Sequence, residues 1–155
     1  MNKNQVFVKL LERVLKFVAI RPRSRQEILR YLQKKIPKNE KLLTQLVKEV
    51  EVLGLIDDRE FAYWWVEQRI TFRPKGKKAL FFELRQKGVD KEMIEEILSE
   101  RLDEIVLARK LAQKKWLSLK NLPPKVGQQK LVGFLSRRGF SWQTVKKVVD
   151  EIDKK

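Results

Sequence analysis

The sequence predicts an all-α fold in which three three-helix repeats form a tandem array, elongated and curved. The first observation is internal similarity: the residues from Gly76 onward recur 51 positions later, from Gly127, and a fainter copy begins 52 positions earlier, at Ser24. The second is that apolar residues recur at helical spacing, without convincing strand-like alternation. The third is that capping residues and glycines bracket these apolar segments. Such a repeat favours helical units that pack on their neighbours.

The repeats are expected at residues 6–54, 55–100 and 101–155, and no Pro-, Gly- or Ser-rich linker separates them. Helix starts and stops divide each repeat into three helices. In the first repeat the signals are Arg21-Pro22-Arg23, the Ser24/Glu27 capping box, Pro37, Asn39 and Gly54. In the second they are Asp57 or Asp58, Arg73-Pro74-Lys75-Gly76, Gly88 and Asp90. In the third they are Asp103, Pro123-Pro124, Gly139 and Ser141.

The net charge indicates which class of partner the chain would bind. Lys and Arg number 36 against 20 Asp and Glu, a net charge of +16. Such an excess favours nucleic acid, anionic lipid or an acidic protein surface as the partner. A second interpretation is that the charges cover solvated helix faces, as in many heat-tolerant proteins.

The residue types that are missing argue against catalysis. The chain has no Cys and no His, which removes thiolate ligands, the commonest metal ligand and the commonest general base. It shows no Gly-rich phosphate loop and no nucleophile–base pair. We therefore expect no enzyme, no metal and no cofactor. A charged N-terminus and the lack of a long apolar run predict a soluble, cytoplasmic protein without a membrane partner.

One segment carries a family resemblance. The run Gly54-Leu55-Ile56-Asp57-Asp58-Arg59-Glu60-Phe61-Ala62-Tyr63-Trp64-Trp65-Val66, followed by the basic Arg69, resembles the signature of the RecX family of bacterial recombinase regulators. The similarity continues through Arg73-Pro74-Lys75-Gly76 and Glu83–Val89, and it recurs at Leu135–Phe140. The resemblance is most specific in the middle third of the chain.

The resemblance implies a function as well as tandem three-helix repeats. Members of this family bind the RecA protein and the RecA–DNA filament, are thought to lie along its groove, and usually suppress its activity. The implied effects are inhibition of the RecA ATPase, filament growth and strand exchange, within homologous recombination, DNA repair and the SOS response. Some members also bind DNA, so single- or double-stranded DNA is a further expected partner. We expect a monomer.

Basic clusters occupy the same place in each repeat, just before or at the start of the second helix. The helix dipole disfavours cations there, so local stability does not explain them. Free N–H groups with added Arg and Lys would suit an anion, although solvated loop charges are the plain alternative. The candidate partner-binding residues are Arg21, Arg23, Arg25, Trp64, Arg69, Arg73, Lys75, Lys77, Lys78, Arg137 and Arg138. Lys120 and Lys125 hold the same place in the third repeat, and a second band includes Arg109, Lys110, Lys114, Lys115 and Lys130.

Three further side chains have two interpretations each. Asp57 and Asp58 suggest a metal or acid–base site, but one Asp capping a helix while both favour its positive end is the preferred interpretation. Trp64 lies off the apolar stripe of Phe61, Ala62, Trp65 and Val66, so it is either an exposed anchor or packs against a neighbouring repeat. The alternative for the whole chain is a helical protein that tracks DNA phosphates without a recombinase partner.

Overall fold

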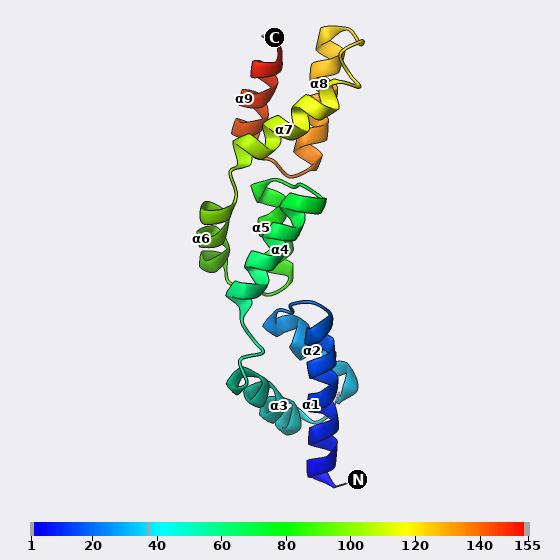
Figure 1. The fold of residues 1–155 in the computed structure, drawn as a ribbon, viewed down its shortest axis with the longest axis vertical. Helices are drawn as coiled ribbons and strands as arrows, with labels where there is room; N and C mark the ends of the chain where they lie inside the picture. The colour runs from blue at the N-terminus through cyan, green and yellow to red at the C-terminus, as the bar shows by residue number, and fades with distance from the viewer. Residues whose placement is uncertain (1, 37, 154–155) are drawn as a thin grey trace.

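The computed structural model describes residues 2–36 and 38–153, and across them it contains nine helices and no strand (Figure 1). The predicted all-α fold is confirmed. The helices are α1 (Lys3–Ile20), α2 (Arg25–Lys35), α3 (Glu40–Val52), α4 (Asp58–Phe72), α5 (Lys77–Gln86), α6 (Lys91–Arg101), α7 (Glu104–Trp116), α8 (Pro124–Arg137) and α9 (Trp142–Asp153).

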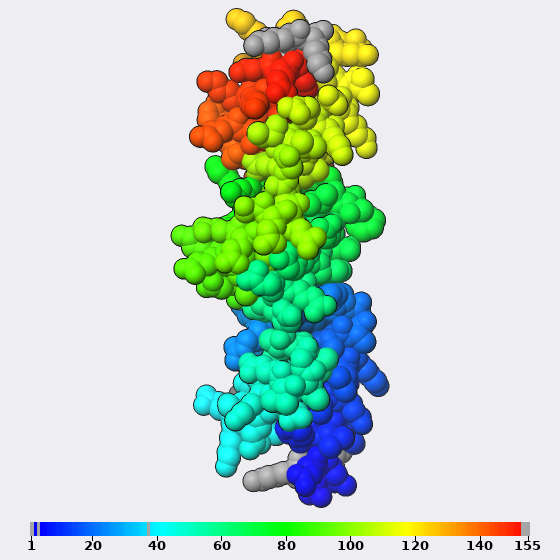
Figure 2. Space-filling view, turned by 60° about the vertical axis from the view of Figure 1, so that its left-hand side comes forward, coloured from blue at the N-terminus to red at the C-terminus, as the bar shows by residue number. Residues whose placement is uncertain are grey.

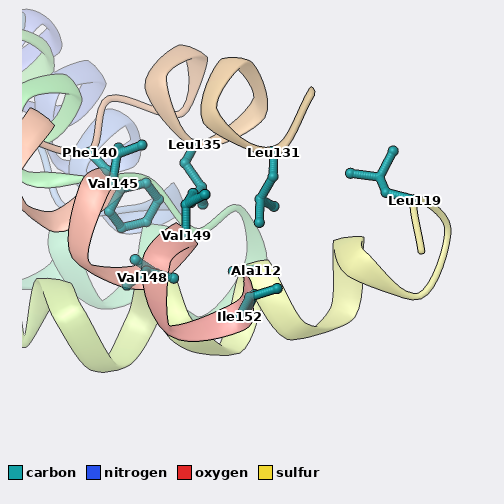
Figure 3. Close-up of a cluster of buried hydrophobic side chains, with 10 residues drawn as sticks. Ala112, Leu119, Leu131, Leu135, Phe140, Val145, Val148, Val149 and Ile152 are labelled. Atoms are coloured by element: carbon teal, nitrogen blue, oxygen red, sulfur yellow. The ribbon is translucent and has the colours of Figure 1, made fainter. Parts of the chain in front are cut away.

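The helices form three units arranged in a row. Each helix packs chiefly on the two others of its own unit, which are α1–α3, α4–α6 and α7–α9. Each unit has its own apolar core, and in the third Leu131 and Leu135 of α8 meet Val145 and Val149 of α9 (Figure 3). The row is elongated, as predicted, in both views (Figures 1 and 2). Its curvature and the exact repeat boundaries remain predictions.

Local sequence signals explain most helix ends. Ser24 and Glu27 form the expected capping box, and Asn39, Asp57 and Asp90 cap α3, α4 and α6. Three glycines that follow helices, Gly54, Gly88 and Gly139, take φ of 73°, 83° and 85°, the left-handed region that a Cβ disfavours. Pro37, the expected end of α2, lies outside the described residues.

The first helix starts earlier than the predicted first repeat, and the third unit departs from the strict 51-residue repeat. Helix α1 begins at Lys3, before the expected repeat at 6–54, because Asn2 and Gln5 form a further capping box. Helix α8 begins at Pro124, one turn before Gly127, because proline suits the first helical position. The turn before it places Leu119 in the third core. An atypical last unit is common in repeat arrays, where no further unit covers the end.

Candidate interaction surface

The second helices of the three units meet end to end. The Ser24 hydroxyl, at the N-terminus of α2, donates to the carbonyl of Lys87 at the C-terminus of α5, at 2.7 Å. At the next junction, the Gly76 N–H donates to the Arg138 carbonyl at 2.7 Å, and the Lys78 N–H donates to the Gly139 carbonyl at 3.0 Å. At the second junction, the N–H groups that begin one helix thus meet the carbonyls that end the next, and at the first junction a hydroxyl donates in their place. The helix dipoles also favour this head-to-tail arrangement.

Two acidic side chains complete these junctions. Asp58, the first residue of α4, accepts the N–H of Arg25 at 2.8 Å. Glu104, the first residue of α7, accepts the N–H of Lys77 through one oxygen, and the N–H and hydroxyl of Ser141 through the other. The expectation of free N–H groups at the starts of α2 and α5 is therefore wrong. Contacts between units satisfy donors that a local pattern leaves open.

Several predicted partner-binding cations hold the fold together. Arg21, Arg23 and Lys87 surround the carboxylate of Glu27, whose side chain is 12% exposed. Burial and the nearby Arg21 lower the pKa of Arg23, and its guanidinium lies 3.8 Å from the centroid of the Phe17 ring.

In the middle unit, the partly buried carboxylate of Glu83 also pairs with two of the predicted cations. Arg69 and Lys75 pair with Glu83, at 2.7 and 3.5 Å, and the Glu83 side chain is 15% exposed. Arg138 donates to the carbonyl of Pro74 and lies over the Phe134 ring. These cations are partly withdrawn from a partner by internal contacts.

Other predicted cations remain available. Arg73, Lys77, Lys78 and Arg137 are exposed, and none forms an ion pair within the described part of the chain. Arg25 is also exposed, although its Nε lies 3.0 Å from Glu51. The free cations flank the junction between the second and third units.

Charge is sorted by helix position. The second helices α2, α5 and α8 together carry ten basic and two acidic residues, and those two acids are the partly buried Glu27 and Glu83. The third helices α3, α6 and α9 carry six basic and ten acidic residues. In Figure 1 the third helices lie toward the left of their units. One row of helices is thus strongly basic and another is acidic, which orients the molecule toward an anionic partner.

Trp64 occupies the boundary between the first two units. It is partly buried, packs on the core of the middle unit, and carries the Arg21 guanidinium 5.4 Å from its ring centroid. The structure therefore favours packing against a neighbouring repeat over the fully exposed anchor. The adjacent Trp65 lies between Arg69 and Lys87, each within 5.5 Å of its ring centroid.

The third unit has a basic hollow of its own. Lys115 of α7 and Lys130 and Arg137 of α8 line it beside Gly133, and no acidic side chain lines it. Lys110, Lys114, Lys120 and Lys125 are exposed nearby in the sequence, whereas Arg109 pairs with Glu151 at 2.9 Å. Cations without carboxylates around a shallow hollow suit a phosphate backbone.

Asp57 and Asp58 have structural roles. Asp57 caps α4 by accepting the Glu60 N–H, and Asp58 serves the junction. Among the described side chains, no group of three or more Asp or Glu could hold a metal ion. Over the same residues no helix is both long and apolar enough to cross a membrane.

Two family models match most of this architecture. The second three-helix domain of RecX matches residues 57–98, and the third three-helix domain of RecX matches residues 103–149. These segments include both junction acids and the basic hollow. The chain belongs to the RecX family.

Curated relatives support this assignment, and solved RecX structures share the fold. A "Regulatory protein RecX" from Chlorobium phaeobacteroides is 33% identical over 144 residues, covering 93% of each chain. Another from Pelodictyon phaeoclathratiforme is 34% identical and covers 84% of this chain and 81% of the relative. The crystal structure of RecX from Lactobacillus salivarius superposes with a TM-score of 0.84 at 22% identity, covering 96% of this chain and 97% of the other. A second structure, of regulatory protein RecX, gives a TM-score of 0.79 at 26% identity, covering 97% of this chain and 78% of the other.

The RecX signature of this chain is mainly structural. Gly54 closes α3, Asp57 caps α4, and Phe61, Ala62 and Val66 are buried in the middle core. A pattern analysis could find these roles because they follow from local spacing. It missed the junction roles of Asp58, Glu104 and Gly76, whose partners are distant in sequence.

The junction acids should respond to pH in opposite directions. Burial opposes the charge on Glu104, but hydrogen bonds from Ser141, Thr144 and Lys77 outweigh it and lower its pKa. Glu104 therefore contributes stability above the usual pKa of a glutamate, and that stability is lost as the pH falls through its lowered pKa. Burial raises the pKa of Asp58, so its contribution is present at acidic pH and is lost as the pH rises.

We expect Glu104→Gln to reduce the loss of unfolding free energy between neutral pH and about pH 3, while lowering stability at neutral pH. The pH profile flattens because the titrating carboxylate is removed. Stability at neutral pH falls because a glutamine amide turns its N–H donors toward the N–H of Lys77 or of Ser141. Urea denaturation at a series of pH values measures both effects. Asp58→Asn is the control: it keeps an acceptor oxygen and removes a partly buried charge, so it should not lower stability at neutral pH. An unchanged pH profile in Glu104→Gln would contradict the assigned role.

Proposed function

We propose that this RecX-family chain regulates RecA by binding along the RecA–DNA filament and inhibiting its ATPase, its growth and strand exchange. One observation carries the proposal: the second helices of three successive units form a basic row whose only carboxylates are Glu27 and Glu83, both engaged internally. A row of similar sites suits a polymer of identical subunits, because several weak contacts act together. The name that the relatives share, regulatory protein RecX, supports the same role.

The proposed mechanism is steric and electrostatic, without chemistry by the chain itself. Exposed cations such as Arg73, Lys78 and Arg137 meet acidic protomer surfaces or exposed phosphates. A rigid array that spans neighbouring protomers would block substrate entry, filament growth or the protomer geometry that ATP hydrolysis requires. We propose that it acts as a monomer in the cytoplasm.

The test uses preformed RecA filaments without free DNA. Added below the RecA concentration, the protein should lower ATP hydrolysis and slow strand exchange, and alone it should hydrolyse no nucleotide. Substoichiometric inhibition is expected because one array contacts several protomers or stops growth at an end. If preformed filaments hydrolyse ATP as before and inhibition is seen only when DNA is limiting, the protein competes for DNA and the proposal fails.

The basic hollow of the third unit supports a second candidate, a DNA-binding protein without a recombinase partner. Lys115, Lys130 and Arg137 line it without an acid. On this alternative, binding to bare DNA would equal binding to the filament at the same salt concentration. It would also weaken steeply with salt, because neutralised phosphates release counterions. Cosedimentation with filaments and with DNA alone, over a salt series, separates the candidates.

A further inference from the structure

Each unit exposes one large apolar side chain at the end of its first helix. Ile20 ends α1 and is 78% exposed, Phe72 ends α4 and is 72% exposed, and Leu117 follows α7 and is 65% exposed. We name these three residues the anchor side chains. None of them belongs to an apolar core in the described part of the chain. In Figure 1 the first helices α1 and α4 run in the same sense along the row, so their ends are equivalent.

Isolated apolar side chains on a surface are ordinary, but recurrence at one structural position is not. Ile20 and Phe72 lie 52 residues apart, the offset of the repeat itself, and each is followed by Arg, Pro and a further basic residue. Contacts within the protein hold Arg21, Arg23 and Lys75 and the carbonyls of both prolines, whereas Arg73 and the two apolar side chains are exposed. Folding alone therefore gives no reason for the repeated exposure.

The surroundings of Phe72 indicate what it would meet. It borders a shallow hollow together with Trp64, Trp65, Arg69 and Arg73, and no acidic side chain lines that hollow. Arg73 is exposed and unpaired within the described residues, and the buried indole N–H of Trp65 has no acceptor there. An aromatic floor beside the free Arg73 fits an apolar protein surface with a carboxylate next to it.

We propose that Ile20, Phe72 and Leu117 are the protein-contacting anchors of this array, each docking on an apolar patch of successive subunits of the recombinase filament, with an acidic residue beside the patch that Phe72 meets. This inference rests on the proposed function. A protein is favoured over nucleic acid because phosphates offer no apolar partner, and because two of the three anchors are aliphatic and cannot stack on bases as aromatic rings do. Leu117 is the C-cap of α7 and so stands one position later than Ile20 and Phe72 relative to the helix end. Anchors at the ends of successive first helices give a multivalent contact with a regular polymer.

The test replaces all three anchors by serine and compares binding to preformed RecA filaments with binding to bare DNA at equal salt. The matched control is the triple substitution Val52→Ser, Leu53→Ser and Trp142→Ser, which removes three exposed apolar side chains at α3 and α9, outside the second-helix row. We expect Phe72→Ser alone to weaken filament binding roughly tenfold and the triple anchor variant at least about 100-fold. The control should stay within about twofold, and all variants should bind DNA like the wild type. Circular dichroism should show unchanged melting, because no anchor lies in a core.

The outcomes are distinguishable. A triple anchor variant that binds filaments like the wild type overturns this inference and leaves the proposed function standing. Equal weakening of filament and DNA binding means that the anchors meet nucleic acid, which also overturns it. Equal weakening by the control set reveals nonspecific hydrophobic attraction and removes the special role of the anchors. If the wild type binds filaments no better than bare DNA, the proposed function fails, and the inference fails with it.

Discussion

Gly76→Ala should uncouple the second and third units. A Cβ on Gly76 would lie 2.3 Å from the Cα and 2.4 Å from the N of Phe140, and these backbone atoms cannot turn aside. The junction must open, which breaks the bonds from Gly76 to Arg138 and from Lys78 to Gly139. At about 1 kcal/mol for each hydrogen bond, with the steric cost added, we expect a loss of roughly 2–4 kcal/mol.

Hydrogen exchange measures where that loss falls. Because each unit has its own core, amides of α7 to α9 should exchange faster than those of α1 to α3, and scattering should show a more variable length. Gly133→Ala is the matched control. Its Cβ would meet only the end of the flexible Arg137 side chain, at 3.0 Å, so the substitution should stabilise α8 by about 1 kcal/mol. If Gly76→Ala leaves the stability unchanged, or changes it by the same amount as Gly133→Ala, the close packing of α5 on α8 is contradicted.

The contrast between these glycines indicates what sequence reasoning can reach. Gly54, Gly88 and Gly139 were predictable as helix ends because a left-handed residue after a helix is a local requirement. Gly76 was visible as a repeated position, but its reason, the approach of Phe140 from another unit, depends on tertiary packing. The repeat, the caps and the core stripes all follow from spacing within one helix or between adjacent helices. For that reason the fold was largely predictable.

The candidate surface was only partly predictable. Positive loops were visible in the sequence, but not which cations would be used internally. Arg69 pairs with Glu83, fourteen positions away, and Arg138 donates to the carbonyl of Pro74 in another unit. The exposed set of Arg73, Lys77, Lys78 and Arg137 is what remains after those pairings. The sorting of charge between second and third helices was present in the sequence once helices were assigned, and a count by helix position would have found it.

Reversal of Arg73, Lys78 and Arg137 to Glu should weaken filament binding roughly 10- to 100-fold, as expected from losing about 0.5–1 kcal/mol at each contact. These three are chosen because they are exposed and unpaired among the described residues. Lys75 is left unchanged because it pairs with Glu83, and Lys77 because a glutamate there would place a second carboxylate beside Glu104. Reversal at either position would disturb the fold as well as the surface. The side chains of Arg73, Lys78 and Arg137 have no such internal partner, so melting of their triple variant should change little. Cosedimentation with filaments measures its affinity.

The matched control reverses Lys91, Lys146 and Lys147, which are equally exposed but lie on the third helices α6 and α9. Both variants lose the same net charge, so long-range attraction to a polyanion falls equally in both. Any difference between them reports direct contact by the second-helix row. If the two variants weaken binding to the same extent, the row has no special orientation and only the overall charge matters. If neither weakens binding, the cations are solvated surface charges, which is the alternative interpretation of the sequence.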